Sequence, residues 1–253
     1  MSDNKLKSNK SMNKKLKKFN TLTEKCYENM IGAVKNDSCW MQAFELLKEI
    51  VIEQRQIDPS FAPELVLLDD ATDFAYDFSG WIEDLTDELD MKQDYEHLLK
   101  VCDELLSLFS WPEYTGSDLK FLRTTTLSSL GRNKESAQYC REWIAAEPEN
   151  VHAAAAGVYA MMRTKEFDEA EQLIRQFIGD GDECTEENDV MFTAASKFYE
   201  ITGNKKARKK MEQVLNAYGE YLEEMFDMGD YDPDEDYEFG DVFSLDDDNL
   251  PFN

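Results

Sequence analysis

Helix-breaking residues are scarce in this chain. Its 253 residues include only 11 glycines and six prolines, whereas proteins built from tight turns and short strands are rich in both. Hydrophobic residues make up 42% of the sequence, an ordinary fraction for a globular protein, so most of the chain can contribute to a packed core. The scarcity of glycine and proline therefore favours helices.

Residue types that carry chemistry are scarce as well. The two histidines, His97 and His152, have no serine, cysteine or second histidine at the spacing of a catalytic triad or a metal site. The five cysteines are odd in number and widely spaced, without a CxxC pair, so we expect neither a disulfide framework nor a zinc site. Glycine-rich phosphate loops, HExxH and GxSxG are absent. We expect no enzymatic activity, no cofactor and no bound metal.

Long apolar runs are also missing. No segment approaches the length needed to span a bilayer, and the lysines near the N-terminus are not followed by the apolar stretch of a secretory signal. The sequence therefore predicts a cytoplasmic protein that does not bind membranes.

Acidic residues, in contrast, are abundant. The chain has 54 acidic and 27 basic residues, a formal net charge of -27. Such a surface repels nucleic acids and anionic membranes and attracts cationic partners. Direct binding of nucleic acid is not expected. The alternative is that the acidity only maintains solubility.

The spacing of apolar residues predicts an all-α protein. They recur at steps of three and four, as on one face of a helix, most clearly over residues 71–85, 95–109 and 167–178. On the first of these stretches, Asp70, Asp73 and Asp77 would share a solvated helix face. No alternating stretch is long enough to indicate a sheet.

Turn and capping residues divide the chain into five antiparallel helix pairs. Asparagine and aspartate cap helix starts, and proline cannot continue a helix, which places breaks at Asp58-Pro59 and Pro148. The predicted pairs are 20–35 with 38–56, a longer pair split by a turn near 88–93, 118–130 with 135–146, 150–163 with 167–179, and 187–201 with 205–226.

Two of these pairs resemble tetratricopeptide repeats (TPRs). Ala137 and Ala170 occupy matching places early in second helices, 33 residues apart, where a small side chain lets helices cross closely. Gly131 at the turn, Pro148 after the second helix and the run 166–170 also match, over residues 118–180, although Lys165 replaces a turn glycine. The resemblance implies a TPR-like α-α superhelix of about five helix hairpins. The alternative is an ordinary helical bundle with coincidental spacing.

The composition changes at both ends of the chain. Residues 1–18 hold seven lysines and are expected to form a basic disordered arm before the helical domain, 19–226. Residues 227–253 hold eleven carboxylates and no lysine or arginine, and are expected to be a disordered acidic tail.

The tip of this tail carries an acidic run followed by an apolar segment. Residues 244–253 (Ser-Leu-Asp-Asp-Asp-Asn-Leu-Pro-Phe-Asn) resemble the acidic tail tip of bacterial single-stranded-DNA-binding proteins. The resemblance implies docking in a basic-rimmed apolar pocket. The candidate contact residues are Asp246, Asp247, Asp248, Leu250, Pro251 and Phe252. Other interpretations are a more general acidic-aromatic motif and a plain solubilising tail.

Two further groups are candidates for partner binding. His152, Tyr159 and Arg163 project from one side of a predicted first helix, and first helices often line the groove of stacked hairpins. A basic cluster opens the last helix, where positive charge opposes the helix dipole. It consists of Lys205, Lys206, Arg208, Lys209 and Lys210. The cluster is expected to bind an anion or acidic peptide, to hold the tail, or to compensate neighbouring carboxylates.

These features favour a helical-repeat adaptor or chaperone-like module that holds a peptide or protein segment in its groove. The acidic tail would recruit a basic partner or occupy the groove until displaced. The alternative is an acidic mimic of nucleic acid, or of a single-stranded-DNA-binding protein tail, that competes for DNA-processing proteins.

Overall fold

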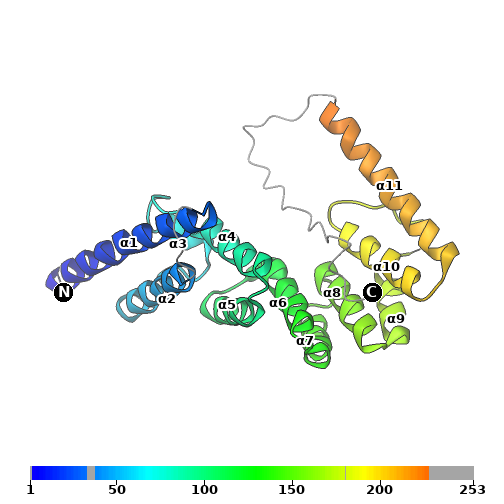
Figure 1. The fold of residues 1–253 in the computed structure, drawn as a ribbon, viewed down its shortest axis with the longest axis horizontal. Coiled ribbons are helices and arrows are strands. Elements are labelled where there is room, and N and C mark those ends of the chain that lie inside the picture. Colours follow the sequence, from blue (N-terminus) through cyan, green and yellow to red (C-terminus); the bar gives the residue numbers. More distant parts are fainter. Residues whose placement is uncertain (1, 33–37, 180, 228–253) are drawn as a thin grey trace.

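The computed structural model describes residues 2–32, 38–179 and 181–227. All regular structure in these ranges is helical, as predicted (Figure 1). The helices are α1 (Ser2–Met30), α2 (Cys39–Ile57), α3 (Val66–Asp70), α4 (Phe78–Met91), α5 (Tyr95–Leu108), the 3-10 turn η1 (Pro112–Tyr114), α6 (Ser117–Ser129), α7 (Asn133–Ala146), α8 (Val151–Thr164), α9 (Phe167–Phe177), α10 (Asp189–Ile201) and α11 (Lys205–Asp227).

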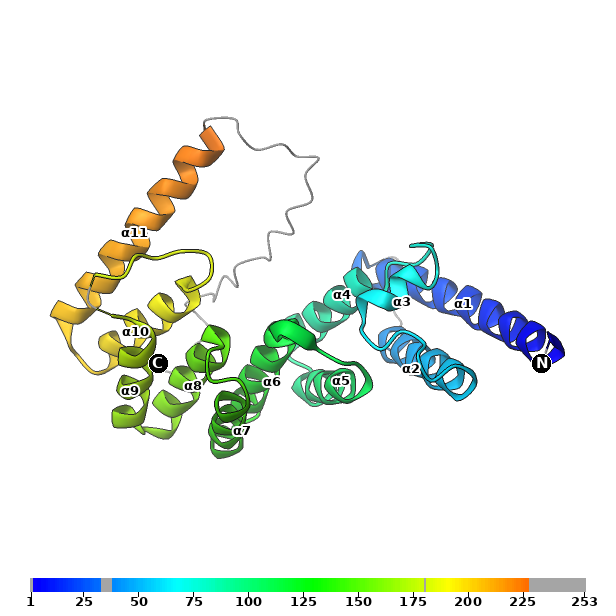
Figure 2. The same ribbon diagram turned by 180° about the vertical axis from the view of Figure 1, so that it is seen from behind.

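Consecutive helices pack as hairpins in an elongated row. The pairs α1–α2, α4–α5, α6–α7, α8–α9 and α10–α11 are in contact, and α5–α6, α6–α8, α7–α8 and α8–α10 join neighbouring pairs. The row bends, so that α4, α6 and α8 lie on the inner side and α5, α7 and α9 on the outer side (Figures 1 and 2). From α6 onward, each helix boundary lies within about two residues of its prediction.

Four hairpin turns close in the same way. Residues 93, 131, 165 and 203 have positive φ angles, between 55° and 75°. In each turn, the N–H of the next residue donates to a carbonyl four residues before the positive-φ position, for example Arg132 to Leu127 (2.8 Å) and Glu166 to Met161 (2.9 Å). This pattern ends a helix in the left-handed conformation, for which glycine is the residue of least strain. Lys165 adopts it at φ 64° without being glycine.

Two predictions about local structure are wrong. Residues 2–18 are not a disordered arm but the first half of α1. Leu16 is buried, and Lys15 forms ion pairs with Glu49 and Glu53 of α2 (both 2.6 Å), which hold the helix against its partner at these two residues.

The predicted helix over 71–85 begins only at Phe78. Phe74 has a positive φ angle and 70% exposure. Buried Asp69 accepts hydrogen bonds from the Phe78 N–H (2.6 Å) and the Ser79 hydroxyl (2.5 Å), which fixes the start of α4. Asp77 caps the same helix through the Gly80 N–H (2.9 Å), so the three aspartates do not share a helix face.

Helix α8 lies at the centre of the C-terminal half. Ala153, Ala154, Ala155 and Ala156 are buried, and α8 contacts α6, α7, α9 and α10. Its N-terminus is fixed by Asn150, 2% exposed, whose side-chain oxygen accepts from the N–H groups of residues 152 and 153 (3.0 and 3.3 Å). The position of α8 is thus fixed by packing and by a buried cap.

Replacing Lys165 by glycine should stabilise the protein by about 1 kcal/mol, because glycine adopts the left-handed conformation without a steric cost. The reciprocal control, Gly131→Ala, should destabilise it by about 1 kcal/mol. Denaturant unfolding followed by circular dichroism measures both changes. A loss of stability in Lys165→Gly would contradict the strain assigned to this turn.

Candidate functional site

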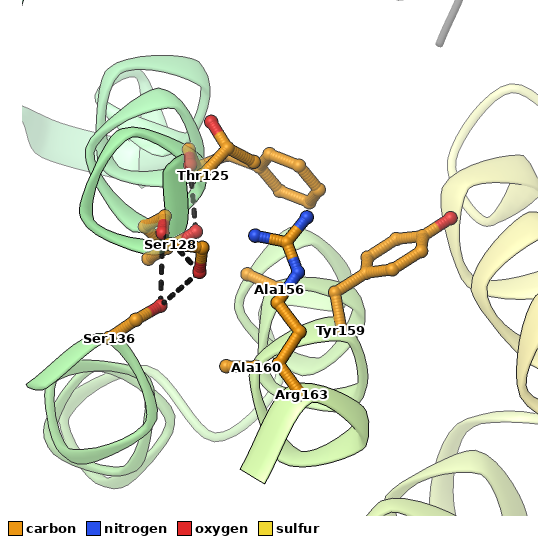
Figure 3. Close-up of a pocket in the computed structure, with 9 residues that line it drawn as sticks. Thr125, Ser128, Ser136, Ala156, Tyr159, Ala160 and Arg163 are labelled. Atoms are coloured by element: carbon orange, nitrogen blue, oxygen red, sulfur yellow. Dashed lines mark hydrogen bonds between the residues drawn. The ribbon is translucent and has the colours of Figure 1, made fainter. Parts of the chain in front are cut away.

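A small pocket lies between α6, α7 and α8, towards the C-terminal end of α8 (Figure 3). It combines apolar walls, several hydroxyl groups and one cation. The lining residues are Phe121, Thr124, Thr125, Ser128, Ser136, Ala156, Tyr159, Ala160 and Arg163. Two of the three residues predicted on the first helix of this pair, Tyr159 and Arg163, therefore line one pocket.

Arg163 supplies the positive charge of the pocket. Its guanidinium extends into the space between α8 and α6, on the side away from Ser136, with the Tyr159 ring beside it (Figure 3). The side chain is half-buried, and burial lowers its pKa. An arginine nevertheless stays protonated at neutral pH, so a charge is held here at a desolvation cost.

Arg163 has no hydrogen-bonding or ion-pairing partner among the described residues. All seven arginines of the chain lie in the described ranges. The other six are paired with carboxylates or, in the case of Arg55, with backbone carbonyls. An unmatched guanidinium is unexpected in a chain with twice as many acidic as basic residues.

The hydroxyl groups of the pocket already donate to the protein. Thr124 and Thr125 donate to backbone carbonyls one turn earlier on α6 (2.7 and 2.9 Å). Ser128 and Ser136 both donate to the Thr124 carbonyl (3.1 and 2.9 Å). Figure 3 shows this network on the side of the pocket opposite Tyr159.

Tyr159 forms the opposite wall. Its ring packs edge-on against Phe121, with centroids 6.2 Å apart, and burial raises the pKa of its hydroxyl to about 12, so the hydroxyl keeps its proton at neutral pH. The hydroxyl has no hydrogen-bond partner among the described residues. The donors left over in this pocket are therefore those of Arg163 and Tyr159, and they suit an anionic acceptor such as a carboxylate.

A second, wider hollow differs from the Arg163 pocket in its charges. It lies between α1, α2 and α5, and its lining includes Lys100, Glu45 and His97. Lys100 pairs with Glu45 (2.7 Å), and His97 contacts Asp94 (2.8 Å). Lys100 in this hollow therefore has a carboxylate partner, unlike Arg163.

The other predicted partner-binding residues lie elsewhere. His152 is near the start of α8, about 16 Å along the helix axis from Arg163, and does not line the pocket. Lys205, Lys206 and Lys209 are exposed at the start of α11, whereas Arg208 pairs with Glu200 (2.9 Å) and Glu212 (2.6 Å).

The structure thus supports charge compensation for Arg208 within the basic cluster, and Lys210 of that cluster also has an interaction partner. The tail-tip candidates Asp246, Asp247, Asp248, Leu250, Pro251 and Phe252 lie outside the described residues.

Sequence reasoning missed the α6 and α7 side of the pocket. The run Thr124-Thr125-Thr126 followed by Ser128 and Ser129 was a usable signal, because hydroxyl-bearing and β-branched residues are poor choices for the interior of a helix. The run turns its hydroxyls onto the backbone and leaves room for Arg163.

Two other classes of site were sought in the described ranges. No group of three or more histidine, cysteine, aspartate or glutamate side chains there could hold a metal ion. None of the helices in those ranges is both long and apolar enough to cross a membrane.

The chain has no match among the protein-family models, the curated proteins or the solved structures with which it was compared. The pocket must therefore be interpreted from its own chemistry.

Replacing Arg163 by methionine should stabilise the unliganded protein by about 1 kcal/mol, because it removes a desolvated charge while keeping an apolar stem of similar length. Arg141 provides the control, since its guanidinium pairs with Glu169 (2.7 Å) and Glu166 (2.9 Å). Arg141→Met should destabilise the protein by about 1 kcal/mol. Thermal unfolding checks both, and equal destabilisation by the two substitutions would show that Arg163 has an internal structural role.

Proposed function

We propose that this protein is a helical-repeat adaptor or chaperone-like module that binds a peptide or protein segment. Its hairpins form a TPR-like α-α superhelix, and the first helices of successive hairpins provide an extended surface on a rigid scaffold. Arg163 and Tyr159 are the anchoring residues, and the bound segment presents a carboxylate to them.

The observation that carries the proposal is the unmatched Arg163. A protein gains no stability from a half-buried guanidinium without an acceptor, so a ligand that supplies the acceptor recovers the desolvation cost. Arginine binds carboxylates through two parallel hydrogen bonds, which gives orientation as well as affinity. Phe121, Ala156 and Ala160 add an apolar contact area next to the charge.

A peptide ligand fits the pocket better than a free small molecule. The pocket is small and half-open and lies on α6 and α8, which belong to the inner side of the row (Figures 1 and 2). It can hold one side chain, while the rest of a longer segment lies along neighbouring helices. A single acidic side chain beside an apolar one is therefore the minimal recognition element.

An array of synthetic twelve-residue peptides tests this function. Peptides with aspartate or glutamate next to an apolar residue should bind the full-length protein, and their amide counterparts with asparagine or glutamine should bind at least tenfold more weakly. Arg163→Met should abolish the difference, because the amide and the carboxylate then meet no cation.

Arg175→Met is the matched control. Arg175 lies on α9 with a side chain 72% exposed and pairs only with Glu171, one turn away on the same helix. This variant changes the net charge equally and should leave the array pattern unchanged. A pattern that survives Arg163→Met, or a preference for basic peptides, would overturn the proposed function.

A further inference from the structure

The charges of the row are divided between its two edges. Turns within hairpins lie on one edge and connections between hairpins on the other. The connections, residues 58–77, 109–116, 147–150 and 178–188, contain no lysine or arginine. The turns carry basic residues, among them Lys92, Arg132, Lys165 and Lys205. Each edge has helix starts and helix ends alike, so helix dipoles do not explain this division.

Arg163 belongs to the basic edge. It lies two residues before the turn residue Lys165, at the C-terminal end of α8. Lys205, Lys206 and Lys209 lie near the turn between α10 and α11 on the same edge, and α10 contacts α8. The pocket is therefore the half-buried part of this edge, whose lysines and arginines stand beside carboxylates such as Asp94, Glu135 and Glu166.

Helix α11 leads from the basic edge to the acidic one. It begins at the turn after α10 and continues for 23 residues, about 34 Å. Burial raises the pKa of Tyr218 on α11, and nearby Asp189 and Glu186 raise it further, which places this part of the helix at the acidic connection. The last nine residues of α11 continue beyond this position, and the end of the helix projects away from α10 (Figure 1).

The residues that follow are themselves strongly acidic. Segment 227–253 has eleven carboxylates and no lysine or arginine. The carboxylates of the connections repel this segment, and the lysines and arginines of the basic edge attract it. Because the cations lie at the far end of α11, only the distal part of the segment can reach them.

Chain length decides which part reaches the pocket. About 19 residues separate Asp227 from Asp246, and such a stretch spans about 60 Å when extended. This exceeds the length of α11, so residues 244–253 can extend past the start of that helix towards α8, which α10 contacts. Residues 230–234 are at most about 25 Å from the helix end when fully extended, which is less than the length of α11.

The chemistry of the distal segment matches the pocket. Residues 246–248 are three aspartates, which supply the acceptor that Arg163 and Tyr159 lack. Residues 250–252, Leu-Pro-Phe, supply apolar surface for the walls formed by Phe121, Ala156 and Ala160.

We propose that residues 244–253 bind the Arg163 pocket of their own molecule, and that an external acidic segment must displace them. The inference rests on the proposed function only in taking the pocket as a binding site for an acidic segment. Attachment through the same chain gives an effective concentration on the order of millimolar, so a weak contact suffices for occupancy.

A competition experiment on the full-length protein tests this contact. The probe is a fluorescently labelled synthetic peptide of residues 242–253, and its binding is followed by anisotropy. In one variant, Asp246→Asn, Asp247→Asn and Asp248→Asn neutralise the tail tip. The matched control carries Asp230→Asn, Asp232→Asn and Asp234→Asn, which remove the same charge from the part of the segment nearest the end of α11.

The tip-neutralised protein should bind the probe about tenfold more tightly than the wild type, because its own tail no longer competes. The matched control should bind like the wild type. Adding Arg163→Met to the tip-neutralised protein should abolish probe binding.

Equal probe affinity for the wild type and the tip-neutralised protein would overturn the intramolecular contact. If external acidic peptides still required Arg163 in that case, the proposed function would stand without it. If both aspartate-to-asparagine variants gained the same probe affinity, the effect would come from net charge alone. Probe binding that survives Arg163→Met would place the contact outside the pocket.

Discussion

Close packing around α8 is the constraint on which the C-terminal half depends. Four buried alanines and Gly157 give α8 small side chains where its neighbours pack. A Cβ atom at Gly157 would lie 2.7 Å from the Ile144 Cδ1 and 3.1 Å from the Leu173 Cδ1. Helices α7 and α9 can approach α8 closely only because these side chains are small. Tyr159 and Arg163, near its C-terminal end, line the pocket next to α6.

This packing explains why an unfavourable charge can be retained. A guanidinium without an acceptor costs stability, and in an isolated helix it would turn into solvent. Here it is confined between α6 and α8, while the surrounding hydroxyls are bound to the α6 backbone and cannot approach it. The other arginines show how readily this chain supplies carboxylates: Arg141, on the neighbouring α7, holds two. A site that loses stability when empty is typical of binding surfaces.

The row of hairpins also sorts charge in space. Because each turn within a hairpin returns the chain to the same edge, basic residues that are separated in sequence gather there, and the acidic connections gather on the other edge. The acidic segment that follows α11 is then attracted to the lysines and arginines of the first edge. Net charge alone would predict only repulsion between this segment and the rest of the protein.

The sequence by itself determined the helical class and most helix boundaries. Periodicity and breakers are local: Pro148 and Gly203 end or separate helices wherever the chain folds. It also singled out Tyr159 and Arg163, because their spacing puts them on one helix face. It failed at residues 71–77, where apolar spacing continued but buried Asp69 starts α4 later. It also failed at residues 2–18, which belong to α1, a helix that contacts α2 through Lys15. Only the tertiary structure decided that Thr125 and Ser128 of α6 line one pocket with Arg163 of α8, and that no carboxylate of the described residues pairs with it, because contacts between separate helices depend on how α8 packs among its neighbours.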